Sequence, residues 1–173
     1  FSTDGINFDA NLNTNILAPF YLRVFKHKDW VYGIAKSIDH ESGGILLRSR
    51  DGLEVFEEGP VILDRQRHVA IVKHETCIDI YYTRIGDSPE SILLSKMPLN
   101  GDWKTWTPSK PINILSPEKD YEGANLPLEP SHAGGISKPV NQLRDPHIFI
   151  ESGKTYLFYC CAGETSISLV ELI

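Results

Sequence analysis

The stretch that decides the fold is YLRVFKHKDWVYGIA, residues 21–35, together with a second copy of the same layout, HVAIVKHETCIDIYY, residues 68–82. In each copy, two runs rich in β-branched and aromatic residues flank a short polar turn. This pattern is typical of a strand, a tight turn and a second strand. The chain therefore contains an internal repeat, and helical periodicity is almost missing from it.

The repeat extends beyond the paired strands. A shift of 47 residues places the Lys-His pair and the Ile-Leu-Leu tripeptide of the first copy on those of the second, with the tripeptides at 45–47 and 92–94. A third unit begins at 145–159 and continues with SISLVEL at 166–172. Gly-containing turns near 52 and 101 introduce a further outer element in the first two units. Each unit is interpreted as a small sheet of up to four strands.

Four antiparallel strands that recur every 45–50 residues are typical of a β-propeller blade. We predict an all-β fold of four-stranded antiparallel propeller blades, resembling an incomplete five-bladed propeller, in one domain spanning 1–173. It comprises three blades and the remnant of a fourth: a remnant at 1–16, blades at about 17–63, 64–115 and 143–173, and a long loop at 116–142. A β-sandwich is the alternative, but it does not explain the shared spacing.

Three blades form an arc, and an arc leaves apolar blade faces uncovered. The opening residues 1–8 copy the outer element of the later units, so we expect inner strands of an earlier blade upstream of them. The sequence therefore predicts either a homodimer through exposed blade faces or a place within a longer chain.

The amino-acid composition argues against several classes of binding partner. The net charge of −6 and the scattered basic residues argue against a nucleic-acid partner. The apolar runs are too short for a bilayer, so no membrane partner is expected. Cys77, Cys160 and Cys161 are too few and too close for a disulfide framework and are interpreted as buried small hydrophobes. No His or Cys spacing predicts a metal, and no cofactor is expected.

The motif Leu-Arg-Asp-Pro-His-Ile-Phe at 143–149, followed by Gly-Lys-Thr-Tyr-Leu-Phe-Tyr at 153–159, is more specific than the repeat. It resembles the Arg-Asp-Pro inner strand of the five-bladed glycosidases, the arabinanase- and xylosidase-like enzymes of glycoside hydrolase family 43 and their invertase-like relatives. Tyr-Glu-Gly-Ala at 121–124 resembles the stretch that carries an acid in family 43. The resemblance is motif-specific over about 120–160, and it implies carbohydrate as the partner.

Enzymes of this kind place carboxylates from different blades around a central pocket. Asp145 is the candidate base or charge stabiliser, with Arg144 beside it to keep it ionised. A general acid needs a raised pKa from apolar surroundings, and Glu122 and Glu129 are the candidates in the long loop. In the family the base comes from the first blade, which this chain does not contain. A structural role for each carboxylate is the competing interpretation.

The starts of the inner strands supply the candidate sugar-binding residues, because equivalent positions of successive blades reach the same channel. These residues, with one from the long loop, are Tyr21, Arg23, Arg67, His68, His132 and Arg144. The tryptophans Trp30, Trp103 and Trp106 are interpreted as packing residues.

Three functions remain open on the sequence. The chain is a glycoside-hydrolase-like propeller that acts on or binds an oligo- or polysaccharide in a central pocket, a non-catalytic propeller that binds carbohydrate or protein, or an inactive truncated portion of a hydrolase. A glycosidase requires a carboxylate pair at the channel, and a binding module does not.

Overall fold

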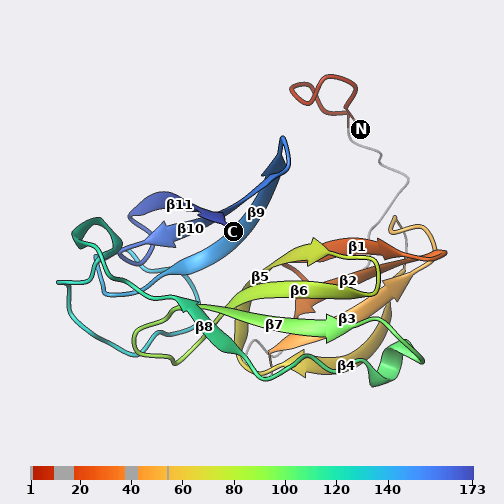
Figure 1. Cartoon of the computed structure of the whole chain (residues 1–173), viewed down its shortest axis with the longest axis horizontal. Coiled ribbons are helices and arrows are strands. Elements are labelled where there is room, and N and C mark those ends of the chain that lie inside the picture. The colour runs from red at the N-terminus through yellow and green to blue at the C-terminus, as the bar shows by residue number, and fades with distance from the viewer. Residues whose placement is uncertain (1, 10–17, 38–42, 54) are drawn as a thin grey trace.

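The structure, a computed structural model, describes residues 2–9, 18–37, 43–53 and 55–173. Within these residues, eleven strands form three antiparallel sheets, and the helical segments are two single turns of 3-10 helix. The all-β prediction is confirmed. Figure 1 shows the three sheets in sequence order along the chain.

The first sheet has the order β1-β2-β3-β4. Its strands are β1 (Arg23–His27), β2 (Trp30–Lys36), β3 (Gly44–Ser49) and β4 (Glu57–Leu63). A two-residue turn joins β1 to β2, and Lys28 in that turn has a φ of 53°. Such positive φ values suit the hairpin turns whose twist matches that of the flanking strands.

The second sheet has the order β5-β6-β7-β8 and lies between the other two. Its strands are β5 (Gln66–Lys73), β6 (Cys77–Arg84), β7 (Ile92–Pro98) and β8 (Ile112–Leu115). Strand β6 is buried on both faces. Ile80 and Tyr82 pack toward the first sheet, whereas the alternate residue Tyr81 packs toward the third. This two-sided burial explains the nearly continuous apolar run in β6.

The third sheet has the order β11-β10-β9. Its strands are β9 (Arg144–Glu151), β10 (Lys154–Cys161) and β11 (Ser166–Leu172). Ser152 and Gly153, with φ values of 52° and 78°, form the turn between β9 and β10. Leu157, Tyr159 and Cys161 of β10 pack against the second sheet.

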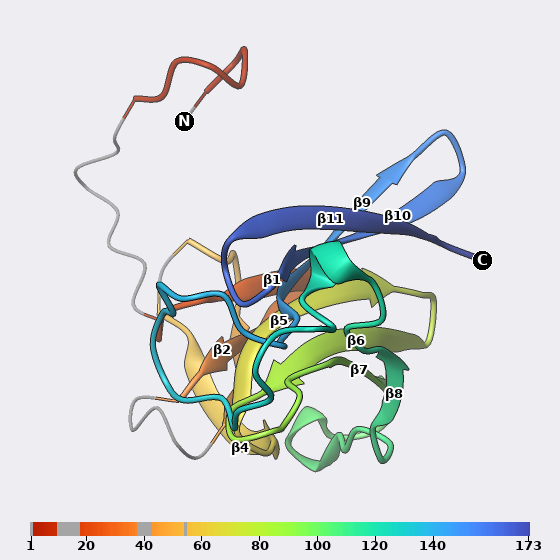
Figure 2. The same cartoon turned by 90° about the vertical axis from the view of Figure 1, so that its left-hand side faces the viewer.

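The first strands of the sheets lie together. Strand β5 is beside both β1 and β9, as Figures 1 and 2 also show from two directions. This arrangement brings residues that are far apart in sequence to one place, where strands β5 and β9 begin.

The outer strand of the second sheet begins later in the sequence than the turn near residue 101 predicted. The Gly-Asp-Trp stretch near 101 does not lead directly into a strand but forms the 3-10 helix η1 (Trp103–Thr105). The Asp102 carboxylate accepts a hydrogen bond from the Lys104 backbone N–H at 3.1 Å, which favours this turn over extended backbone. Trp103 and Trp106 are buried between the first two sheets, as their predicted packing role requires. The fourth strand β8 therefore starts nine residues after Trp103.

The N-terminal segment forms no strand within its described residues, 2–9. The Asp4 carboxylate accepts hydrogen bonds from the backbone N–H groups of Ile6 and Asn7, which closes a local turn. The outer strand expected within 1–16 is not formed by residues 2–9, and the rest of that range, residues 1 and 10–16, lies outside the described residues. Among the residues described, no helix is long and apolar enough to cross a membrane.

Candidate functional site

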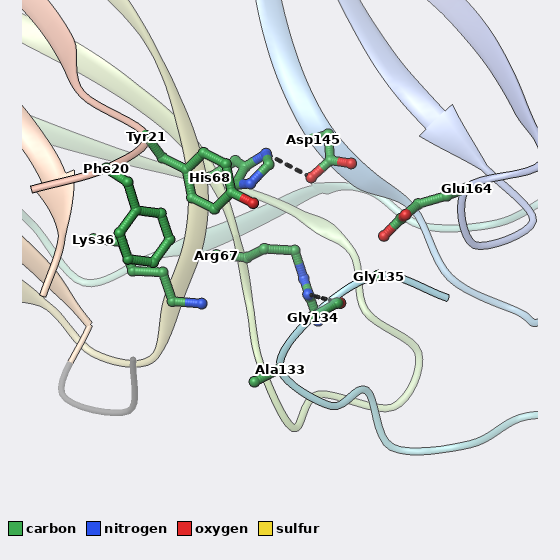
Figure 3. A pocket seen from close by; sticks show the side chains of 10 residues that line it. All are labelled: Phe20, Tyr21, Lys36, Arg67, His68, Ala133, Gly134, Gly135, Asp145 and Glu164. Carbon is green, nitrogen blue, oxygen red and sulfur yellow. Dashed lines mark hydrogen bonds and ion pairs between the residues drawn. The ribbon is translucent and has the colours of Figure 1, made fainter. Parts of the chain in front are cut away.

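A cavity of about 440 Å³ lies where β5 and β9 begin. Its walls come from all three sheets and from the long loop, and Figure 3 shows their side chains converging on one space. The lining residues are Phe20, Tyr21, Lys36, Arg67, His68, Ala133, Gly134, Gly135, Asp145 and Glu164. Of the residues named from sequence, Tyr21, Arg67, His68 and Asp145 lie here.

Asp145 of β9 and His68 of β5 contact each other directly at the wall of the cavity. The Asp145 Oδ1 and His68 Nδ1 atoms are 2.7 Å apart, drawn as a dashed line in Figure 3. Burial by itself raises the pKa of the Asp145 carboxyl, but His68 and the charge of Arg67 outweigh burial and lower that pKa below its usual value. Asp145 is thus held ionised, although by residues of another sheet and not by Arg144.

The backbone is strained at two of the lining residues. Asp145 has a φ of 51° and Tyr21 a φ of 59°, a region that residues other than glycine seldom adopt. At Asp145 the strain coincides with a shift in register between β9 and β10, which directs the carboxylate toward the cavity wall. Strain of this kind is characteristic of binding and catalytic sites.

Aromatic rings form one wall. The Tyr21 ring lies on the His68 ring with centroids 3.9 Å apart, and Phe20 contacts Tyr21 edge-on at 4.7 Å. Both Phe20 and Tyr21 are more than two-fifths exposed. An exposed aromatic wall beside hydrogen-bonding groups can receive the apolar face of a sugar ring.

Arg67 forms the floor of the cavity. Its guanidinium makes a bidentate ion pair with the fully buried Glu90, with N–O distances of 2.8 and 3.0 Å. It also donates hydrogen bonds to the backbone carbonyl oxygens of His132 and Gly134. The Arg67 guanidinium therefore already binds protein groups, and two of its hydrogen bonds hold the long loop in place.

Arg144 is buried behind the cavity and does not line it. It donates to the side-chain oxygen of Gln142, to the Gly134 carbonyl oxygen and to Glu164, the last at 2.7 Å. The expected contact between Arg144 and Asp145 is absent among the described interactions, because neighbouring residues of a strand point to opposite sides. Arg144 instead positions the turn that carries Glu164 into the cavity.

Glu122 and Glu129 lie outside the cavity. Glu122 is buried and accepts hydrogen bonds from the Tyr159 hydroxyl at 2.7 Å and from two backbone N–H groups, of Glu118 and Lys119. Burial favours a raised pKa for Glu122, but these hydrogen bonds outweigh it and lower the pKa. The prediction that Glu122 has the raised pKa of a general acid is therefore wrong. Three hydrogen-bond donors reach its carboxylate and stabilise the ionised form.

Glu129 is half-buried and pairs with Lys138 at 2.7 Å. With His132 it borders a second, smaller cavity on the other side of the long loop. His132 reaches the main cavity only through its carbonyl oxygen, which Arg67 holds. Arg23 is exposed on β1 and does not line the main cavity.

The sequence did not point to Lys36, Phe20 or Glu164. Lys36 ends the second strand of its sheet and Glu164 lies in the turn before β11, so neither lies at the start of an inner strand, where the repeat predicts site residues. The signal available in the sequence was the polar residue at the end of an apolar strand, as in Gly-Ile-Ala-Lys at 33–36. Among the described residues, no cluster of His, Cys, Asp and Glu is arranged to hold a metal ion.

Comparison with known proteins finds one related sequence and several structures of similar fold. No protein-family model matches the chain. It is 41% identical over 185 residues to an uncharacterised protein of Acanthamoeba polyphaga mimivirus, and this match covers 97% of the chain and 50% of the viral protein. The chain thus spans about half the length of that relative.

Two solved structures are similar in fold. One is an exo-beta-1,3-galactanase from Clostridium thermocellum, with a TM-score of 0.57, 15% identity, and coverage of 92% of this chain and 35% of the enzyme. The other is a thermostable family-43 glycoside hydrolase, with a TM-score of 0.54, 16% identity, and coverage of 88% and 47%. At these identities the likeness concerns the fold alone, and the all-β chain resembles both enzymes in fold.

Proposed function

We propose that the chain is a carbohydrate-active propeller unit of the glycoside hydrolase type, which binds an oligosaccharide in the cavity between its three sheets. The observation that carries the proposal is the cavity itself, with exposed Phe20 and Tyr21 on one wall and the ionised Asp145 on another. Aromatic faces combined with a few fixed polar groups are how proteins recognise sugars.

In this proposal each sheet is a blade, at about 17–63, 64–115 and 143–173, and residues 1–16 belong to a fourth. The approach of β5 to β1 and β9 supports this interpretation, because the inner strands of successive blades surround a common channel. The loop at 116–142 then forms a rim of the channel.

Asp145 is proposed as the carboxylate that faces the sugar, acting as a base or as a stabiliser of positive charge on the ring. Its lowered pKa supports this role over that of a general acid. Glu164 is the second carboxylate of the cavity and comes from the same sheet.

A non-catalytic carbohydrate-binding propeller is the second candidate. The observation that favours it is that neither Glu122 nor Glu129, the two candidate acids, lines the cavity. The sugar-binding wall is the same in both candidates, so binding and hydrolysis must be measured separately.

The chain is also proposed to self-associate through the outer face of the third sheet. Phe149, Ile167 and Leu169 are exposed on β9 and β11, and β11 is the edge strand of that sheet. An exposed edge with apolar neighbours favours association.

The test combines calorimetric binding of neutral and acidic oligosaccharides with an assay for released reducing ends. We expect Tyr21→Ala to weaken binding by about tenfold, since stacking on the ring is lost. Tyr121→Ala, at an exposed tyrosine away from the cavity, is the matched control. Asp145→Asn is expected to abolish any hydrolysis while leaving binding measurable.

The two candidates give different results. Hydrolysis by the wild-type chain that Asp145→Asn removes supports the enzyme, and binding without hydrolysis supports the binding module. Saccharide binding that is equally strong in Tyr21→Ala and wild type would overturn the proposed site.

A further inference from the structure

Lys36 is an unusual member of the cavity wall. Its side chain is 3% exposed, it lies at the end of β2, and Figure 3 shows its amine directed into the group of lining side chains. Among the described residues, no carboxylate lies within ion-pair distance of the Lys36 amine and no hydrogen bond is made by it.

The other cations at the cavity are paired. Arg67 forms an ion pair with Glu90, and Arg144, behind the wall, forms one with Glu164. Asp145 contacts the His68 ring. Lys36 is therefore the cavity cation that no described carboxylate contacts in an ion pair.

A largely buried lysine without an ion-pair partner is costly, because the part of its hydration that is lost is not compensated. Burial, and then the charge of Arg67, lower the pKa of Lys36, while the charge of Glu90 acts in the opposite direction. A bound anion would offset this cost and would favour the charged form of the amine.

We propose that the cavity takes an acidic sugar, a uronic acid whose carboxylate pairs with the Lys36 ammonium while its ring lies against Phe20 and Tyr21. This inference rests on the proposed function and names its substrate class. It assigns to Lys36 the discrimination between acidic and neutral sugars.

The surrounding charges favour a carboxylate over a phosphate. Lys36 offers a single ammonium, which matches a single negative charge. The carboxylates of Asp145 and Glu164 line the same cavity and repel a doubly charged anion more strongly than a singly charged one. The aromatic wall also requires a ring beside the anion, which free phosphate lacks.

The experiment measures binding of galacturonic acid and galactose, which differ at one carbon, with the methyl ester of the acid as a neutral analogue. The chain carries a net charge of −6, so monosaccharides or short oligomers are used to avoid repulsion from a polyanion. Glucuronic acid and glucose form a second pair. Inorganic phosphate is added as a competitor.

We expect the wild-type chain to bind the acid about ten- to a hundredfold more tightly than the neutral sugar or the ester, the range for a charge-assisted hydrogen bond. Lys36→Met is expected to remove this preference, so that the acid and the neutral sugar bind the variant with equal affinity. Lys110→Met, at an exposed lysine away from the cavity, is the matched control. The ratio of the affinities for acidic and neutral sugar is also measured on the wild-type chain, so the test does not depend on whether the variant folds.

The outcomes separate the two proposals. Equal affinity for acid and neutral sugar in the wild type overturns the acidic-sugar inference and leaves the carbohydrate site standing. Absence of binding for every saccharide overturns the proposed function. Competition by phosphate as strong as that by the acid also overturns the inference, since the site would then be one for simple anions.

Discussion

Arg67 and Arg144, on strands of two different sheets, donate hydrogen bonds to the same backbone oxygen, that of Gly134, at 2.9 and 3.3 Å. Through this shared acceptor the second and third sheets jointly hold the long loop against the cavity. The arginines therefore build the site, whereas the sequence had suggested that they bind the sugar.

Removal of the Arg67 guanidinium is expected to be strongly destabilising. Arg67→Met leaves the fully buried Glu90 without its bidentate partner, at a cost of about 3–5 kcal/mol in the free energy of unfolding. Urea unfolding measures this, and Arg23→Met on the exposed face of β1 is the control, expected within about 0.5 kcal/mol of wild type. The double variant Arg67→Met, Glu90→Met should recover much of the loss, because no uncompensated charge remains. A double variant as unstable as Arg67→Met would refute this account of the pair.

The Glu122 carboxylate should contribute to stability in a defined pH range. Its pKa is lowered in the folded state from an ordinary value of 4.5, so its contribution is present above about pH 4.5 and is lost as the pH falls through the lower folded-state pKa. At pH 7 Glu122→Gln is expected to cost about 1–3 kcal/mol through the weakened bonds to Tyr159 and the backbone. The difference between variant and wild type should shrink toward pH 3. A difference that stays constant across this range would show that Glu122 is not held ionised.

The thiol of Cys160 reports on Asp145. Burial, followed by the charge and hydrogen bond of Asp145, raises the pKa of Cys160 to about 11. At pH 8 its thiolate fraction should be about a hundredfold below that of a thiol of pKa 9, so alkylation by iodoacetamide is slow. Asp145→Asn is expected to lower the pKa of Cys160 and accelerate its alkylation, read by peptide mass spectrometry. Cys77 serves as the internal reference, and unfolded protein should label evenly. An unchanged Cys160 rate in Asp145→Asn would place the carboxylate elsewhere.

The outer face of the third sheet should determine the oligomeric state. Phe158 is directly opposite Leu169, and Cys160 opposite Ile167, so these side chains share one face of the sheet. Leu169→Glu introduces a charge on this face and is expected to convert a wild-type dimer to a monomer in light scattering. Ile112→Glu, at an exposed isoleucine on β8, should leave the dimer intact. A wild-type chain that is monomeric at every concentration would overturn the proposed association.

Strand positions could be read from the sequence to a large extent. The tripeptides at 45–47 and 92–94 fall within β3 and β7, and the segment at 166–172 coincides with β11, because alternation and turn residues are local signals. The fourth strands could not be placed, since a capping carboxylate at Asp102 and the burial of Trp103 and Trp106 decide where β8 begins.

The site was only partly visible in the sequence. Asp145, His68 and Tyr21 share the starts of repeating strands, and the structure brings these three into one cavity. The roles of Glu90 and Lys36 depend on contacts between sheets. Arg67 pairs with Glu90 across 23 residues of sequence and reaches Gly134 across 67, which no local pattern encodes.

At His132 and Gly134 the rim of the cavity is held through main-chain oxygens, which accept hydrogen bonds from Arg67 and Arg144. The side chains at positions 132 and 133 can consequently be exchanged while the arginines keep their backbone acceptors. Randomising positions 132 and 133 would yield a library in which the scaffold is constant and only the chemistry presented at the mouth varies. Such a rim is a place where new ligand preferences can evolve without loss of the fold.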